Sequence, residues 1–187
     1  MSDSNSPIQV DAVVVGAGIT GIYQTYLLDR KGMSVLGVDA ADDVGGTWFW
    51  NRYPGCRLDT ESYAYGYFAL TGIIPDWKWS ERFAGQAEML RYVNAAADAM
   101  DVRRHYKFKT KVLSAHFLDD DKRWQITLDS GETVHARFFI SATGPLSASK
   151  MPDYKGIDLF KGEAFHSSRW PRDDQGNLAG MNFAGKR

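Results

Sequence analysis

The sequence predicts an α/β domain, and three consecutive segments near its start carry that prediction. Residues 10–15 (VDAVVV) form a β-branched, apolar run that is typical of a buried parallel strand. A glycine-rich turn follows, and residues 19–31 then read as a helix that ends at Gly32. Residues 34–39 read as a second buried strand. Strand, helix and strand in this order indicate the βαβ unit of a Rossmann-like domain.

The later segments predict one more helix and a small antiparallel β excursion. Residues 41–74 are rich in Gly, Tyr and Trp without clear periodicity, which is typical of a long functional loop. Residues 85–100 place apolar side chains at helical spacing. Residues 129–131 (DSG) read as a hairpin turn inside an excursion over about residues 105–136. The expected strands are residues 107–117, 123–128 and 133–138, followed by a final apolar strand over residues 138–142.

The composition fits an ordinary globular protein and argues against several kinds of partner. Lys and Arg (22) nearly balance Asp and Glu (23), so no charged surface for nucleic acid is expected. No apolar run is long enough for a membrane span, and no His or Cys cluster has metal-ligand spacing. The single cysteine, Cys56, fits a reducing compartment and predicts a cytoplasmic protein. Residues 1–10 lack the pattern of a secretory signal and are expected to form a disordered tail.

Residues 16–21 (GAGITG) form a G-x-G-x-x-G motif directly after the first strand. In such a motif the first glycine, Gly16, permits a tight turn, and the second, Gly18, lets the backbone approach a pyrophosphate. The third, Gly21, lets the helix pack closely on the strand. Free N–H groups at the start of the helix, with Ala17 in the turn, then face the phosphates. The alternative interpretation is an ordinary glycine-rich turn.

Asp39 stands at the end of the second strand, where a carboxylate accepts hydrogen bonds from a ribose 2′-hydroxyl. The same carboxylate would repel a 2′-phosphate, which favours FAD or NAD over NADP at this turn. The alternative interpretation is an aspartate that only caps the strand.

Paired glycines and a second short motif favour FAD over NAD. Gly45 and Gly46 resemble the second FAD contact of glutathione-reductase-like flavoproteins, because a glycine backbone can lie against the dinucleotide without a Cβ clash. Residues 142–144 (ATG) resemble the segment that closes the FAD domain of that group. Two positions depart from the wider pattern of these proteins. The ribose acid is Asp39 rather than the commoner Glu, and Thr25 stands where Gly or Ala often extends the glycine motif.

Three further blocks resemble the type I Baeyer–Villiger monooxygenases, which are class B flavoprotein monooxygenases. Residues 160–171 (FKGEAFHSSRWP) match the F-x-G-x-x-x-H-x-x-x-W-P fingerprint of that family. Residues 45–62 (GGTWFWNRYPGCRLDTES) match its G-G-T-W-x-x-N-R-Y-P-G-x-x-x-D-x-x-S block, and residues 77–83 (WKWSERF) continue the likeness. The resemblance covers essentially the whole chain after the tail. Seen alone, residues 160–171 also fit a surface loop with a packed Phe and Trp and a solvated His.

The resemblance implies a set of contacts to FAD. Thr47, Trp48 and Trp50 would line the flavin, and such an aromatic wall shields flavin chemistry from water. Tyr65 would lie near the flavin pyrophosphate, and the backbone of Val112 would touch the adenine. The expected cofactor-binding residues are Gly16, Ala17, Gly18, Gly21, Asp39, Gly46, Thr47, Trp48, Trp50, Asp59, Tyr65, Val112 and Thr143.

The resemblance also implies two residues with a part in the reaction. Asp59 would sit beside the isoalloxazine as an orienting carboxylate, although it also fits a turn-capping role. His166 would couple the FAD domain to a second nucleotide domain, although a linker that only spans distance is the alternative. The residues expected on the NADP side are Arg57, Leu58, Asp59 and Trp170.

The family's reaction follows from the resemblance alone. NADPH reduces FAD, O₂ adds to give a C4a-peroxyflavin, and the peroxide converts a ketone to an ester or lactone. Residues 11–146 would form a glutathione-reductase-like FAD domain, and residues 147–187 a linker that ends before the expected NADPH domain. The chain would then be the N-terminal FAD-binding portion of the enzyme and inactive by itself. The alternatives are a related flavin N- or S-monooxygenase and an FAD-binding module without turnover.

Overall fold

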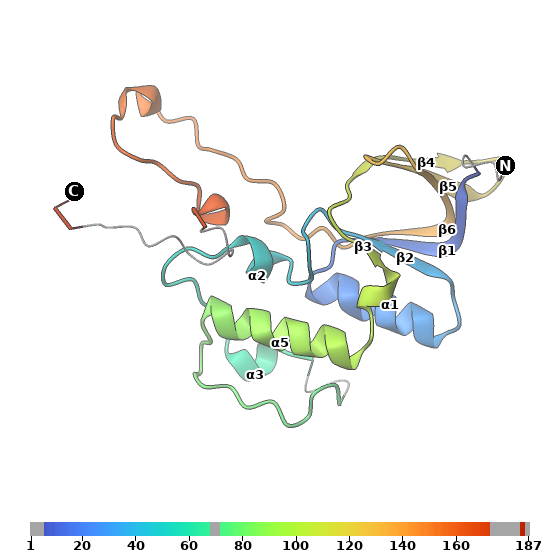
Figure 1. Ribbon diagram of the computed structural model, residues 1–187, viewed down its shortest axis with the longest axis horizontal. Coiled ribbons are helices and arrows are strands. Elements are labelled where there is room, and N and C mark those ends of the chain that lie inside the picture. The colour runs from blue at the N-terminus through green and yellow to red at the C-terminus, as the bar shows by residue number, and fades with distance from the viewer. Residues whose placement is uncertain (1–5, 68–71, 173–183, 186–187) are drawn as a thin grey trace.

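The protein folds around a six-stranded mixed sheet. The computed structural model describes residues 6–67, 72–172 and 184–185. The strands are β1 (Ile8–Val15), β2 (Val35–Val38), β3 (Tyr106–Lys107), β4 (Val112–Leu118), β5 (Arg123–Leu128) and β6 (Thr133–Ser141). They lie in the order β3-β2-β1-β6-β5-β4, so the first strand is central and pairs in parallel with both β2 and β6 (Figure 1).

The helices are α1 (Ile19–Arg30), α2 (Thr47–Trp50), α3 (Ser62–Tyr65) and α5 (Gln86–Ala99), with 3-10 turns η1 (Arg103–His105), η2 (Ile157–Leu159) and η3 (Ser167–Arg169). Helix α1 packs on β1 and β2, and α2, α3 and α5 lie beside it, farther from the sheet (Figure 1). The βαβ unit of β1, α1 and β2 is therefore confirmed. The loop expected over residues 41–74 contains two short helices, α2 and α3, and its residues 68–71 lie outside the described part.

The first strand begins earlier than the sequence analysis expected. Ile8 pairs with Val134 and Val10 with Ala136, so residues 8–10 belong to the sheet and not to a tail. Ala12, Val13 and Val14 are fully buried, as a central parallel strand requires. The prediction that the tail extends to residue 10 was wrong because β6 supplies partners for these residues.

The β excursion continues the main sheet instead of leaving it. The two segments expected at residues 133–138 and 138–142 are one strand, β6, which pairs in parallel with β1 and antiparallel with β5. The segment expected at residues 107–117 is two strands, β3 and β4. Lys109 separates them, because its φ of 53° lies in the left-handed region, which a strand does not use.

The buried apolar side chains form two clusters. One contains Ile22 of α1, Met89 and Val93 of α5, and the rings of Trp48 and Tyr92. Trp77 and Trp79 pack on Tyr92, with ring centroids 5.2 and 4.8 Å from that of Tyr92, and so lie against this cluster. The other cluster joins β1 and β2 to the β5–β6 hairpin through Val13, Val38, Ile126, Leu128, Val134 and Ala136.

The C-terminal part runs away from the sheet and then returns toward α2 (Figure 1). Its apolar side chains are unusually exposed, with Tyr154 at 66%, Leu159 at 71% and Phe160 at 60%. The end of the expected linker, at residues 173–183 and 186–187, lies outside the described part of the chain. Among the residues that the structure does describe, no helix has both the length and the apolar character that a bilayer crossing requires.

Candidate dinucleotide-binding site

A cavity of about 860 Å³ opens where β1, β2 and β6 end. Its wall contains the glycine turn after β1, the start of α2, the end of β6 and the residues just before β4. The sequence-predicted residues that line it are Gly16, Gly18, Asp39, Gly46, Thr47, Trp48, Trp50, Tyr65, Val112 and Thr143. The fold thus brings together most of the predicted cofactor contacts, although they come from six separate parts of the chain.

The floor of the cavity is made of backbone, because glycines leave no room for side chains. At Gly16, with φ at +109°, a Cβ atom would overlap the carbonyl oxygen of Ala142. At Gly46, with φ at +54°, a Cβ atom would lie 2.6 Å from Cα of Gly18. A Cβ atom on Gly18 itself would meet only ordinary contact, 3.5 Å from Cα of Gly46, and would point a larger side chain toward the cavity. Such a cradle fits the pyrophosphate of a dinucleotide.

Gly21 and Ala17 build the turn without lining the cavity. A Cβ atom on Gly21 would overlap the carbonyl oxygen of Gly16, so close packing of α1 on β1 requires glycine here. The N–H of Ala17 donates to Oδ2 of Asp39 at 2.5 Å. These two predicted residues therefore support the turn from behind.

Asp39 follows β2 and faces the cavity. Its Oδ2 accepts from the N–H of Ala17, and its Oδ1 accepts from the N–H of Ala41 at 2.7 Å. A carboxylate oxygen can accept more than one hydrogen bond. Asp39 thus braces the glycine turn and keeps acceptor capacity for a ribose hydroxyl, so the fit to a dinucleotide and the strand-capping interpretation are compatible.

Aromatic side chains form one wall of the cavity. Nε1 of Trp48 donates to Oη of Tyr65 at 3.3 Å, and their rings meet edge to face with centroids 5.8 Å apart. Trp48 is 5% exposed, so its indole is fixed by the core behind it. Trp50, from the end of α2, completes this wall.

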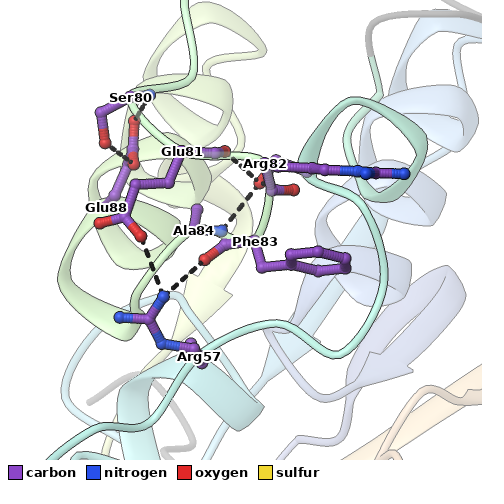
Figure 2. A network of polar contacts seen from close by, with 8 residues as sticks. Arg57, Ser80, Glu81, Arg82, Phe83, Ala84 and Glu88 are labelled. Carbon is purple, nitrogen blue, oxygen red and sulfur yellow. Dashed lines mark hydrogen bonds and ion pairs between the residues drawn. The ribbon is translucent and has the colours of Figure 1, made fainter.

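Residues 57–59 lie away from the cavity. Arg57 donates to Oε2 of Glu81 at 2.9 Å and to the carbonyl oxygen of Phe83, as Figure 2 shows. Leu58 is buried in the helical core at 4% exposure. Asp59 is exposed, and its Oδ1 accepts from Oγ1 of Thr60 at 3.4 Å. The fold therefore does not bring these expected nucleotide-side residues onto the cavity wall.

The loop around Arg57 is fixed by a network of polar contacts between two segments. Ser62 donates to the carbonyl oxygens of Glu81 and Arg82 at 3.0 Å, and its Oγ accepts from the N–H of Ala84 at 2.9 Å. On the far side, Glu88 accepts from both the N–H and the hydroxyl of Ser80 (Figure 2). Ser62, the last residue of the family-like block 45–62, thus holds this loop to residues 81–84.

The fingerprint segment, residues 160–171, has its own local order. A Cβ atom on Gly162 would overlap the ring of Phe160, which explains the F-x-G spacing. Nδ1 of His166 accepts from the N–H of Ser168 at 3.2 Å and so caps η3. The ring of Trp170 packs on Phe165 with centroids 5.7 Å apart.

Two arginines that the sequence analysis missed attach this segment to α2. The guanidinium of Arg169 lies over the ring of Trp50, and Arg169 also lines the cavity. Nη2 of Arg172 donates to the carbonyl oxygen of Phe49 at 2.9 Å, and burial lowers the pKa of Arg172. The sequence pattern does not indicate these contacts with α2, because they form only where the chain after β6 folds back toward α2.

The donor set of the site suits an organic cofactor and not a metal ion. In the described ranges no group of three or more His, Cys, Asp or Glu side chains could hold a metal. Backbone N–H groups, glycine turns and indole rings are instead the groups that bind phosphates and flat rings.

Comparison with known proteins places these features in a family context. A family described as NAD(P)-binding Rossmann-like domain matches residues 14–70. The chain is 66% identical to 2-oxo-Delta(3)-4,5,5-trimethylcyclopentenylacetyl-CoA monooxygenase of Pseudomonas putida, over 100% of this chain and 34% of that protein. It is 41% identical to acetone monooxygenase (methyl acetate-forming) of Gordonia sp., over 97% of this chain and 33% of that protein.

Solved structures agree with the sequence matches. The crystal structure of OTEMO in complex with FAD and NADP superposes with a TM-score of 0.90 at 67% identity, over 97% of this chain and 34% of that chain. The closed crystal structure of cyclohexanone monooxygenase gives a TM-score of 0.81 at 43% identity, over 89% of this chain and 32% of that chain. The chain spans about a third of the length of the relatives that it matches.

Proposed function

Since the chain belongs to the type I Baeyer–Villiger monooxygenase family, we propose that it is the FAD-binding part of a longer, NADPH- and O₂-dependent monooxygenase. The observation that supports this proposal most directly is the cavity, where the glycine turn, Asp39 and the aromatic wall of α2 meet. The proposed substrate class is ketones, and the products are esters or lactones. The relatives named for acetone and for a cyclopentenylacetyl-CoA support this class.

The residues of the chain divide the task of holding FAD. Gly16, Gly18 and Gly46 give the pyrophosphate a side-chain-free floor. Asp39 accepts hydrogen bonds from the adenosine ribose. The indole of Trp48 borders the flavin end and excludes water, which protects oxygen-transfer chemistry from hydrolysis. Bound FAD would supply the redox chemistry, by taking electrons from NADPH and passing one oxygen atom of O₂ to the ketone.

The residues outside the cavity face the remainder of the enzyme in this proposal. Asp59 is exposed and free to orient a cationic side chain of the NADPH-binding part. Trp170 and His166 hold the fingerprint in shape, and Arg169 connects it to the cavity wall. Leu58 is buried, so it would meet NADP only through its backbone.

A second candidate function is oxygenation of an amine or sulfide. The chain is 38% identical to a phenazine N-monooxygenase of Lysobacter antibioticus, over 98% of this chain. Because this part of the chain is similar to relatives named for both reactions, the products decide between them. A third candidate is a flavin-binding module without turnover, which corresponds to the 187 residues acting alone.

The proposal is tested on the full-length protein that contains this chain. Purified protein should be yellow, and acid precipitation should leave the flavin in solution because no side chain is expected to tether it. NADPH oxidation should rise on addition of a ketone, and the ester or lactone should carry one atom from ¹⁸O₂. The 187-residue chain should bind FAD without consuming NADPH. A flavin-free full-length protein would contradict the proposal, and formation of N-oxides or S-oxides without esters would favour the second candidate.

A further inference from the structure

Two linked hydroxyl groups lie behind the glycine turn, outside the cavity, and the proposed function assigns them no role. Oη of Tyr106, from β3, donates to the carbonyl oxygen of Gly16 at 3.2 Å. The same hydroxyl lies 3.1 Å from Oγ1 of Thr25, from α1. Since the single proton of Tyr106 goes to Gly16, Thr25 is the donor in the second contact. The two side chains thus form a short relay that ends on the first residue of the turn.

The relay is set inside the protein. Thr25 is fully buried, where an unsatisfied hydroxyl would be costly and valine would fill the same space without one. The ring of Tyr106 packs over Gly37 of β2, where a Cβ atom would lie 2.5 Å from the ring. Burial raises the pKa of Tyr106, so its hydroxyl stays protonated and able to donate at neutral pH. A largely enclosed hydroxyl pair whose hydrogen bonds are all satisfied holds one geometry.

The peptide unit between Gly16 and Ala17 is held at both ends. Its carbonyl oxygen accepts from Tyr106, and its N–H donates to Oδ2 of Asp39. Because a peptide unit is planar, fixing both of these atoms fixes the direction of the whole unit. The second oxygen of Asp39 is fixed by the N–H of Ala41, so the remaining acceptor positions of the carboxylate also have a set direction.

We propose that Thr25 and Tyr106 are positioning residues for FAD, which orient the Gly16–Ala17 peptide and, through it, Asp39. The inference rests on the proposed FAD-binding function and adds the two residues that set the geometry of the cradle. It also gives a reason for Thr25 at a position where Gly or Ala is common in flavoproteins, because neither of those residues has a hydroxyl to give to Tyr106.

The test measures the Kd of FAD for the full-length protein, after removal and return of the flavin, by quenching of flavin fluorescence. Loss of one hydrogen bond from the relay, in Thr25→Val or Tyr106→Phe, should raise the Kd about threefold to tenfold. Thr25→Ser keeps the hydroxyl and should restore the wild-type Kd. The double variant Thr25→Val/Tyr106→Phe should raise the Kd by less than the product of the two single effects, because both act on one relay.

A matched control separates this role from the general loss of a tyrosine hydroxyl. Tyr26 lies on the same helix as Thr25 and accepts from Nη1 of Arg30 at 2.9 Å, away from the turn. Tyr26→Phe should leave the Kd unchanged. Urea unfolding midpoints of all variants show whether a change in Kd reflects the site or the stability of the fold. If Tyr106→Phe fails to fold, the comparison of Thr25→Val with Thr25→Ser decides.

Three outcomes would overturn the inference. The first is an unchanged Kd in Thr25→Val and Tyr106→Phe, and the second is a serine variant as weak as the valine variant. The third is an equal loss of affinity in Tyr26→Phe. Each of these outcomes leaves FAD binding by the wild-type protein intact. A wild-type protein that takes up no FAD would instead overturn the proposed function together with this inference.

Discussion

The guanidinium carbon of Arg169 lies 4.6 Å from the centroid of the Trp50 ring. Arg169 belongs to the fingerprint segment and Trp50 to α2, so the contact joins parts of the chain that are far apart in sequence. Both side chains also line the cavity, so the contact connects the fingerprint segment to the wall that borders the proposed flavin.

Replacing Arg169 should disturb flavin reduction more than flavin binding. Arg169→Met keeps an aliphatic stem but removes the cation–π contact, which is worth roughly 0.5–2 kcal/mol. We expect full FAD content and a change of about twofold to tenfold in the rate of NADPH-driven reduction, measured by stopped-flow absorbance. Arg169→Lys, which keeps a cation, is the control. Equal reduction rates in the methionine variant and the wild type would show that the contact does not affect flavin reduction.

Substitutions at Gly18 and Gly21 should have different effects, the first on FAD binding and the second on the stability of the fold. Gly18→Val places a side chain toward the cavity with only ordinary contact at its Cβ, so the protein should fold and lose FAD. Gly21→Ala overlaps the Gly16 carbonyl, so it should destabilise the fold by about 1–3 kcal/mol, as overpacking does. Thermal unfolding followed by circular dichroism, together with flavin absorbance, separates the two effects. A folded Gly18→Val protein that retains all of its flavin would refute the assignment of the pyrophosphate site.

Asp59 should matter for oxygenation but not for assembly of the FAD site. Its exposed carboxylate is free to orient a cation from the remainder of the enzyme. Asp59→Ala should therefore keep its FAD and lower ketone conversion about 10²–10³-fold, the range for loss of an oriented electrostatic contact. Thr60→Ala, which removes the neighbouring hydroxyl, is the matched control. Rapid-mixing measurement of conversion by the reduced enzyme tests this, and unchanged conversion would leave Asp59 as a turn residue.

His166 should affect communication between the nucleotide sites. Its ring caps η3, and loss of such a cap costs roughly 0.5–2 kcal/mol locally. His166→Ala should loosen the segment that carries Arg169, with normal FAD content but slower NADPH-driven reduction. His166→Asn retains an acceptor for the N–H of Ser168 and should recover part of the rate. Normal values for FAD content, reduction and oxygenation in the alanine variant would show that His166 has no role in the reaction.

The sequence predicted those parts of the site that depend on neighbours along the chain. The βαβ unit, the glycine turn and the place of Asp39 follow from short runs of residues, because strand, turn and helix signals there lie within one supersecondary unit. The paired glycines were also predicted, since close backbone approach has a direct signature in residue type. The family resemblance added the aromatic wall, which no local pattern indicates.

Contacts that depend on the return of distant segments could not be predicted. Arg169 and Arg172 contact α2 only because the chain after β6 turns back. Hydrophobic periodicity in the sequence does not predict such a turn. The two halves of β6 were separated because β1, which pairs along nearly the whole of β6, is remote in sequence. The break between β3 and β4 was missed within the strand expected over residues 107–117, since the left-handed Lys109 carries no glycine signal.

The place of β6 between β1 and β5 has a consequence for the order in which the protein is made. Gln9 and His135 are 126 residues apart in sequence and yet neighbours in the sheet. The β1–β2 pair can form early in synthesis, but one edge of β1 stays open until residues 133–141 leave the ribosome. Closing so long a loop is slow, and an open apolar strand is prone to aggregation while it waits. Variants that delay β6 should therefore lower the yield of soluble protein before they affect flavin binding.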